Sequence, residues 1–89
     1  MLKIHTTNRF EKEVRLAAAQ GKDLVKLRDI MQKLAMQEPL DNKHRDHLLF
    51  GNYNGRRECH IQPDWLLIYA LRDEKIVFER TGSHSDLFQ

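Results

Sequence analysis

The spacing of hydrophobic residues predicts a strand and then a helix at the amino terminus. Residues 2–6 alternate apolar and polar side chains, as a half-buried strand does. Side-chain oxygens at positions 6–8 can cap a following helix, and Gly21 can end it. Between these signals, residues 8–20 carry an apolar stripe at positions i, i+4 and i+7, formed by Phe10, Val14 and Ala17.

A second helix is predicted directly afterwards, with Asp23 as its N-cap. Its apolar face recurs with a helical period and consists of Leu24, Leu27, Met31 and Leu34. On a helical wheel, three lysines lie almost opposite this face: Lys22, Lys26 and Lys33. This lysine stripe is either a solvated outer surface or a surface that binds an anionic partner.

Two hydrophobic runs around an Asn-Gly pair predict a β-hairpin. A polar, aperiodic segment at 38–46 joins the helices to the runs at 48–53 and 56–61. The pair Asn54-Gly55 between the runs is the strongest short-range signal for a hairpin with a two-residue turn. We therefore expect a meander of short antiparallel strands to begin here.

The two-residue turn fixes a register for this hairpin. Four residues should then share one apolar face: Leu48, Phe50, Cys59 and Ile61. On the opposite face, His47 and His60 become diagonal neighbours with Cα atoms roughly 7 Å apart. Both imidazole side chains could then reach one group of a substrate.

The last third of the chain predicts the rest of the sheet. Residues 65–71 are apolar on both faces, as in a central strand, and residues 75–80 follow a turn as a further strand. The predicted order is a strand, two helices and an antiparallel meander. This is an α+β fold, a single small domain over residues 1–89 with two N-terminal helices packed on a twisted antiparallel sheet.

Composition excludes several classes of protein. The chain has 89 residues, of which 40% are hydrophobic, and this composition suits one globular domain rather than a disordered chain. The single cysteine, Cys59, cannot form an internal disulfide, which favours a reducing compartment such as the cytoplasm. No apolar run approaches the ~20 residues that span a bilayer, and no signal-peptide core follows Met1. We expect neither membrane association nor export.

Charge permits an anionic partner without requiring one. The chain has 15 Lys and Arg residues against 13 Asp and Glu residues, for a net charge of +2. Residues 1–45 contain ten basic and six acidic side chains, whereas residues 46–89 contain five and seven. The basic surplus therefore lies in the first half of the chain.

Four histidines of the second half are candidates for chemistry: His44, His47, His60 and His84. A metal site could use the spacing His44-x-x-His47 with one of the other two, but this spacing is not diagnostic and no compact carboxylate cluster accompanies it. A serine nucleophile beside His84 is also conceivable, but sequence neighbours rarely adopt triad geometry and no G-x-S-x-G motif is present. Both interpretations are weaker than general acid–base catalysis.

Acid–base cleavage of RNA matches the available residue types better. RNA carries its own nucleophile in the 2′-hydroxyl, so a metal-free ribonuclease needs a base for that oxygen, an acid for the leaving 5′-oxygen and cations for the developing charge. Histidine, aspartate and arginine supply all three. Histidine suits the task because its unperturbed pKa of roughly 6.5 lets both protonation states exist near neutral pH.

Three sequence blocks resemble the YafQ-type toxins of the RelE/ParE superfamily. The blocks are DHLLFG at 46–51, RECHIQPDWLLIY at 57–69 and FERTGSHSDLF at 78–88. The resemblance covers nearly the whole chain and implies a RelE-like fold. It also implies a bacterial mRNA interferase that enters the ribosomal A site and cuts the codon there. An antitoxin encoded beside such a toxin would inhibit it. No cofactor or metal ion is implied.

The resemblance implies a catalytic centre formed by His47, His60, Asp64 and His84. Arg80, Phe88 and Glu58 would bind the substrate. Arg80 and Phe88 would place its phosphate and its base, and Glu58 stands where relatives carry an acidic residue. Several of these residues also have a purely structural alternative. Asp64 could close a turn, His84 could cap a helical turn, and Arg80 could pair with Glu79 or Asp86.

The implied partners are a cognate antitoxin, expected to be of the ribbon-helix-helix type, and the ribosome with its mRNA. Contacts with RNA phosphates are expected from Lys22, Lys26, Lys33, Lys43, Arg45, Arg56 and Arg57.

Two other functions compete with this interpretation. One is a ParE-like toxin that blocks a topoisomerase without cutting nucleic acid, and the other is an accessory nucleic-acid-binding domain that needs only the basic first half. Alanine at Asp64 and His84 separates them, because it should abolish RNA cleavage in the first interpretation and spare binding in the others.

Overall fold

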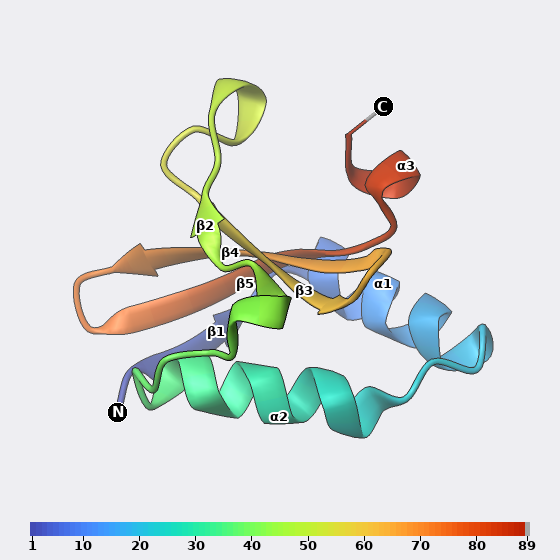
Figure 1. Ribbon diagram of the computed structural model, residues 1–89, viewed down its shortest axis with the longest axis horizontal. Coiled ribbons are helices and arrows are strands. Elements are labelled where there is room, and N and C mark those ends of the chain that lie inside the picture. The colour runs from blue at the N-terminus through green and yellow to red at the C-terminus, as the bar shows by residue number, and fades with distance from the viewer. Residues whose placement is uncertain (89) are drawn as a thin grey trace.

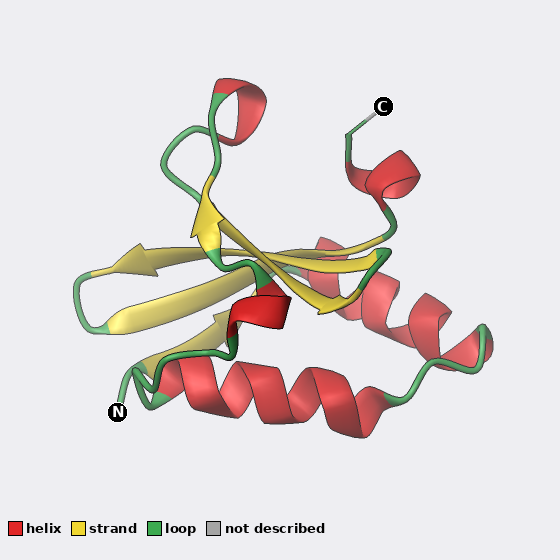
Figure 2. Cartoon of the chain, in the orientation of Figure 1, coloured by secondary structure: helices red, strands yellow, loops and turns green. Residues whose placement is uncertain are grey.

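Two helices lie against one face of a five-stranded sheet in the computed structural model, which describes residues 1–88 (Figure 1). The helices are α1 (Asn8–Ala19), α2 (Leu24–Ala35) and the single turn α3 (His84–Leu87). The strands are β1 (Lys3–Thr6), β2 (His47–Leu48), β3 (Arg57–Gln62), β4 (Trp65–Arg72) and β5 (Lys75–Gly82). Two 3₁₀ turns, η1 (Asn42–His44) and η2 (Gly51–Tyr53), lie on either side of β2 (Figure 2).

The two long helices begin and end where the sequence predicts. Oγ1 of Thr7 accepts a hydrogen bond from the backbone N–H of Phe10 at 3.0 Å, and Oδ1 of Asp23 accepts one from Val25 at 3.0 Å. These caps satisfy N–H groups that a first helical turn leaves unpaired. Each helix has 12 residues, and within the described part of the chain no helix is long and apolar enough to cross a membrane.

The sheet has the strand order β1-β5-β4-β3-β2 and is mixed. Its neighbouring strands are antiparallel except for β1 and β5, which run parallel. The α+β prediction is therefore confirmed, but the expected antiparallel sheet contains one parallel pair. Parallel pairing needs a long connection, and here both helices lie between the two strands. The predicted central strand, β4, is the middle strand, and its residues 65–70 are buried.

The register of β2 with β3 differs from the predicted one. β2 contains only two residues, and His47 lies opposite Glu58. Leu48 pairs with Arg57 and so lies on the predicted face with Cys59. However, Leu48 and Phe50 are 52% and 80% exposed, so neither joins the apolar core with Cys59 and Ile61. The predicted and observed partners of His47 differ by an even number of residues. His47 therefore still lies on the same face of the sheet as His60.

The turn at Asn54-Gly55 explains the changed register. The turn exists and is closed by a 2.9 Å hydrogen bond from the N–H of Arg56 to the carbonyl of Tyr53. However, Asn54 has φ −53° and ψ 134°, and Gly55 has φ +84°. These are the angles of a type II turn, which lacks the twist that lets a type I′ turn continue two paired strands. The N–H of Leu49 still donates a hydrogen bond to the carbonyl of Arg56 at 2.8 Å, and residues 50–55 leave the ladder and form a loop that contains η2.

The main hydrophobic core lies between the two long helices and the sheet. It includes Phe10 and Ala17 of α1, Leu27 and Ile30 of α2, and buried side chains of the three central strands. A second, smaller core lies on the opposite face of β4, where Leu49 and Tyr53 pack against Leu66, Ile68 and Leu87. This second core holds the η2 loop and α3 on the sheet face that the long helices leave uncovered.

Cys59 is fully buried in the main core, and burial raises the pKa of its thiol above the ordinary value. The thiolate is the reactive form, so both effects protect the sulfur. We expect the native protein to react with a thiol-specific disulfide reagent at pH 8 on the order of 100-fold more slowly than the protein in denaturant. The absorbance of the released thiolate measures both rates, and equal rates would contradict this burial.

Candidate active site

A buried carboxylate holds two histidines together on the sheet face opposite the long helices. Glu58 is 4% exposed, and its Oε1 lies 3.3 Å from Nε2 of His60 and 3.5 Å from Nε2 of His47. Glu58 and His60 are two residues apart on β3, so their side chains point to one face. His47 reaches the same face from β2. The structure thus brings His47 and His60 together as the sequence analysis expects, although through a different register.

Backbone carbonyl groups determine which ring nitrogen carries the hydrogen in two imidazoles. Nδ1 of His47 faces the carbonyl of Arg45, and Nδ1 of His44 lies 2.6 Å from the carbonyl of His60. A carbonyl oxygen only accepts hydrogen bonds, so Nδ1 carries the hydrogen in both rings. Nε2 of His47 is then the nitrogen that gains or loses a proton, and this nitrogen faces Glu58.

Asp64 and His84 form a second acid–histidine pair. Asp64 lies in the turn between β3 and β4, and its Oδ1 accepts hydrogen bonds from the backbone N–H of His84 at 3.0 Å and from Nδ1 of the ring at 2.7 Å. These two hydrogen bonds lower the pKa of the Asp64 carboxyl below its ordinary value. Because Nδ1–H of His84 is held by Asp64, Nε2 is the nitrogen left for proton exchange with a substrate.

The group around Glu58 and the Asp64–His84 pair meet through their imidazole rings. The ring centroids of His60 and His84 are 5.5 Å apart in an edge-to-face arrangement. We use the term histidine cluster for His47, Glu58, His60, Asp64 and His84. Phe88 borders this cluster, with its ring 6.4 Å from that of His84. In residues 1–88 no three His, Cys, Asp or Glu side chains are arranged to hold a metal ion.

A basic groove of about 850 Å³ adjoins the histidine cluster and includes His60 and His84 in its lining. Its walls come from α2, from η1 and from the end of β3. Asp29 is the acidic residue of its lining, against four cations: Lys26, Lys33, Lys43 and Arg45. Among the described residues, none of these four cations has a carboxylate within ion-pair distance. The basic groove therefore presents uncompensated positive charge beside the histidines.

The position of the lysine stripe differs from the prediction. Ile30 is buried, although the sequence analysis did not include it in the apolar face of α2. Its burial turns the inner face of the helix toward Lys26 and Lys33, which therefore border the basic groove instead of lying opposite the core. Lys22 precedes α2 and is outside the groove lining, but it adds a small electrostatic contribution that lowers the pKa of Asp64.

Two of the predicted RNA-binding arginines are ion-paired away from the groove. Nε of Arg56 lies 3.0 Å from Oε1 of Glu79, and Nε of Arg57 lies 3.2 Å from Oδ1 of Asp46. Neither arginine lines the basic groove. RNA binding by Arg56 and Arg57 stays a prediction.

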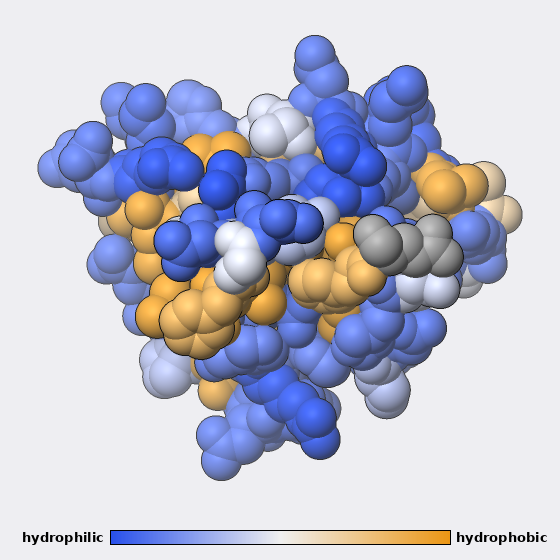
Figure 3. Space-filling model, turned by 90° about the horizontal axis from the view of Figure 1, so that it is seen from above, coloured by the Kyte–Doolittle hydropathy of each residue, from blue (hydrophilic) through white to orange (hydrophobic). Residues whose placement is uncertain are grey.

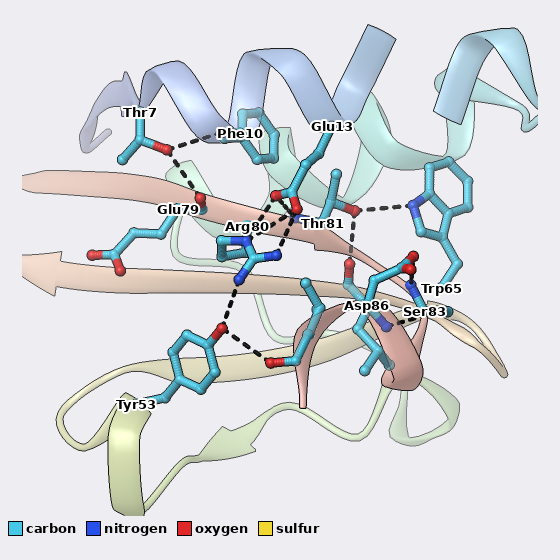
Figure 4. A network of polar contacts seen from close by, with 12 residues as sticks. Thr7, Phe10, Glu13, Tyr53, Trp65, Glu79, Arg80, Thr81, Ser83 and Asp86 are labelled. Carbon is cyan, nitrogen blue, oxygen red and sulfur yellow. Dashed lines mark hydrogen bonds and ion pairs between the residues drawn. The ribbon is translucent and has the colours of Figure 1, made fainter. Parts of the chain in front are cut away.

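Arg80 lies outside the histidine cluster and is 8% exposed. Its guanidinium pairs with Glu13 of α1, with an Nη2–Oε2 distance of 2.7 Å, rather than with Glu79 or Asp86 (Figure 4). Nη1 donates a hydrogen bond to the hydroxyl of Tyr53 at 2.8 Å. Contact between Arg80 and a substrate phosphate stays a prediction.

The sequence analysis missed Glu13, although its spacing carried a signal. Together with the stripe of Phe10, Val14 and Ala17, Glu13 completes the pattern i, i+3, i+4 and i+7 of the inner helix face. A carboxylate at such a position must find a partner, because burial of an unpaired charge is costly. The sequence could thus have pointed to a buried ion pair, but not to Arg80, which is 67 residues away.

Hydrophobic side chains interrupt the hydrophilic surface of the molecule when it is seen from above (Figure 3). Phe50 is 80% exposed and Phe88 is 45% exposed. Exposed aromatic rings offer flat surfaces on which nucleobases can stack. The ring of Phe88 offers such a surface beside His84, whereas the ring of Phe50 lies at the start of the η2 loop.

The fold and the site together define a class of protein. Two helices on one face of a small sheet, with histidines and carboxylates gathered on the other face, form the arrangement implied by a RelE-like toxin domain. Residues 2–89 match the family model described as the bacterial toxin of type II toxin-antitoxin systems, YafQ. The chain belongs to this YafQ family.

Individual relatives resemble the chain over nearly its full length. The mRNA interferase toxin YafQ of Escherichia coli K12 is 42% identical over 86 residues, which cover 96% of this chain and 94% of the relative. The toxin in the crystal structure of the E. coli DinJ-YafQ complex is 40% identical, with a TM-score of 0.91 and full coverage of both chains. A metal-bound toxin from Helicobacter pylori is 39% identical, with a TM-score of 0.93 over 99% of this chain and 100% of that one.

Proposed function

We propose that this chain is an mRNA interferase, an endoribonuclease that cleaves mRNA in the ribosomal A site and thereby inhibits translation. Its family and the mRNA interferase name of its E. coli relative support the reaction class. The observation that carries the proposal is the histidine cluster, in which imidazoles and carboxylates lie in contact beside a basic groove. The long helices and the central strands share one core, which supports action as a single domain over residues 1–89.

The proposed reaction needs no metal ion, because RNA supplies its own nucleophile. One imidazole removes the proton from the 2′-hydroxyl as that oxygen attacks the adjacent phosphorus. A second, protonated imidazole gives its proton to the 5′-oxygen as the P–O5′ bond breaks. The products are a 2′,3′-cyclic phosphate and a 5′-hydroxyl. His47 and His60 on one side and His84 on the other supply the two imidazoles.

The two carboxylates act on the reaction through the histidines. Asp64 holds His84 by two hydrogen bonds, so it fixes the orientation and the tautomer of the ring. Glu58 was expected to contact the substrate, but it is 4% exposed. We therefore assign it the same positioning task toward His47 and His60. Phe88, which is partly exposed beside His84, would stack on a base of the codon.

The basic groove supports a role for the ribosome. With a net charge of only +2, the chain should hold naked RNA weakly. Ribosomal RNA offers a dense phosphate surface for the cations of the basic groove. The A site at the same time presents one codon to the histidine cluster at high effective concentration.

A cognate antitoxin is the second proposed partner. The E. coli relative forms a complex with DinJ, which supports a protein partner for this chain as well. We expect an antitoxin of the ribbon-helix-helix type that covers the histidine cluster or the basic groove. Toxin and antitoxin would act in the bacterial cytoplasm, where mRNA is translated.

A ribosome-bound mRNA with a single 2′-deoxynucleotide on the 5′ side of the scissile bond tests the proposed chemistry. We expect no cleavage of this mRNA, whereas the all-ribose control should be cut to a 2′,3′-cyclic phosphate. Protein pretreated with EDTA and dialysed into ribosome buffer should cleave the control at an unchanged rate. Cleavage of the deoxy-substituted mRNA, or loss of activity after EDTA treatment, would contradict metal-free attack by the 2′-hydroxyl.

A further inference from the structure

Arg80 bridges the two faces of the sheet at a free edge of β5. β1 ends at Thr6, opposite Phe78, so within residues 1–88 no strand lies beside the last residues of β5 on that side. The register between β4 and β5 also shifts here, because Ile68 pairs with Arg80 and Tyr69 with Phe78. This bulge directs Arg80 to the face of Ile68, away from the face that α1 covers. Its guanidinium can therefore contact groups from both faces.

The guanidinium connects α1 to the η2 loop and to α3. Nε lies 3.0 Å from both carboxylate oxygens of Glu13, and Nη2 lies 2.7 Å from Oε2. On the other side, Nη1 donates to the hydroxyl of Tyr53, which donates in turn to the carbonyl of Leu87 at 3.1 Å. We call this chain of contacts the clamp; it consists of Glu13, Arg80, Tyr53 and the Leu87 carbonyl (Figure 4).

The clamp is strongly bonded at its centre. Glu13 also accepts a hydrogen bond from the backbone N–H of Thr81 at 3.2 Å, so both of its oxygens are engaged. The hydrogen bonds from Arg80 to Glu13 raise the pKa of the guanidinium above its ordinary value. Bidentate arginine–carboxylate pairs fix geometry as well as charge, because the two groups are planar and match in width.

The clamp ends on the element that carries part of the histidine cluster. α3 has only four residues, and a single turn is not stable by itself in water. Its place is set by the Ser83 and Asp86 capping box, by the hydrogen bond from the His84 N–H to Asp64, by burial of Leu87 and by the hydrogen bond from Tyr53. His84 begins this turn, so we expect a movement of the Leu87 carbonyl to disturb the hydrogen bonds of His84 to Asp64.

We propose that Glu13 is a positioning residue that sets the place of His84 through the clamp. The proposal rests on the proposed ribonuclease function. Glu13 is on the helix face of the sheet and has no contact with the histidine cluster, so its effect must pass through Arg80 and Tyr53. If Arg80 served only to bind substrate, loss of its contacts with Glu13 or Tyr53 would raise KM and leave kcat unchanged.

Two isosteric variants test the clamp by kinetics. Glu13→Gln weakens the ion pair, and Tyr53→Phe removes only the hydroxyl and keeps the ring against Phe88. We expect each to lower kcat about tenfold with KM changed less than about twofold, since small displacements of catalytic groups cost rate rather than binding. Combined with His84→Ala, neither variant should lower the residual rate further. Glu11→Gln, an exposed change on the same helix, is the matched control and should leave kcat unchanged.

A measurement without RNA separates the clamp from the proposed function. In both variants the backbone amides of Leu87 and Phe88, which hydrogen-bond within α3, should exchange with deuterium about tenfold faster than in the unaltered protein. Unchanged exchange would overturn the clamp even if the protein proved to have no ribonuclease activity. If a double variant with His84→Ala lost kcat by the product of the two single losses, the assignment of the clamp to His84 would be overturned. Tyr53→Phe keeps both readouts available if the Glu13 variant does not fold.

Discussion

Replacing His84 by alanine is expected to lower the rate of cleavage of ribosome-bound mRNA by about 10²- to 10⁴-fold, the range typical of lost acid–base catalysis. The ring is half exposed, and only its Nδ1 is occupied, by Asp64. Its removal therefore takes away a proton-exchanging nitrogen without opening the hydrophobic core. Association with the ribosome, measured by cosedimentation, should remain nearly unchanged because the cations of the basic groove are intact.

The matched control for this variant is His5→Ala. His5 is an exposed histidine on β1, at the sheet edge away from β2 and β3, so its loss should not change the cleavage rate. A single-turnover assay at saturating ribosome concentration isolates the chemical step from binding. If His84→Ala cleaves within a factor of about five of the unaltered protein, His84 does not carry acid–base catalysis.

Reversing the charge of three cations of the basic groove should weaken ribosome association by about 100-fold or more at physiological salt. The variant changes Lys26, Lys33 and Lys43 to glutamate, so each site repels the phosphate that the lysine would attract. The dependence of log affinity on log salt should also become shallower, by roughly 0.7 to 0.9 for each phosphate that is no longer neutralised. Cosedimentation across a range of salt concentrations measures both quantities.

A second triple variant controls for net charge. Lys3, Lys12 and Lys75 are exposed lysines outside the groove lining, and their change to glutamate shifts the net charge equally. This variant should retain most of the affinity, because screening limits the reach of surface charges to about a Debye length. Equal reductions of affinity in the two triple variants would show that net charge rather than the basic groove controls association. Such a result would leave the assignment of the histidine cluster untouched.

Local chemistry in the sequence predicts much of this fold. Asp23 caps α2, and the uninterrupted apolar run at 65–71 becomes the middle strand of the sheet, because capping and burial depend on neighbouring residues. The grouping of His47 with His60 also follows from strand parity, which survives an even change of register. The predictions of the helix cap and of the buried strand are therefore confirmed, whereas the hairpin register predicted from Asn54-Gly55 is wrong.

Features set by distant residues could not be derived in the same way. The type II geometry at Asn54-Gly55 accompanies the packing of Leu49 and Tyr53 onto the second core. The residues of the turn do not predict that packing. The parallel pairing of β1 with β5 and the ion pair of Arg80 with Glu13 join opposite ends of the chain. Sequence patterns give spacing along one element but not the partner of that element in space.

The pairing of β1 with β5 constrains when the protein can become active during its own synthesis. Lys3 pairs with Lys75, and His84 joins the histidine cluster only after β5 has been made. At about 5 to 20 residues per second, a ribosome needs roughly 4 to 17 seconds to translate as far as His84. Throughout that time the nascent chain lacks an assembled histidine cluster. Under the proposed function, this topology delays activity until the ribosome that makes the chain has translated His84.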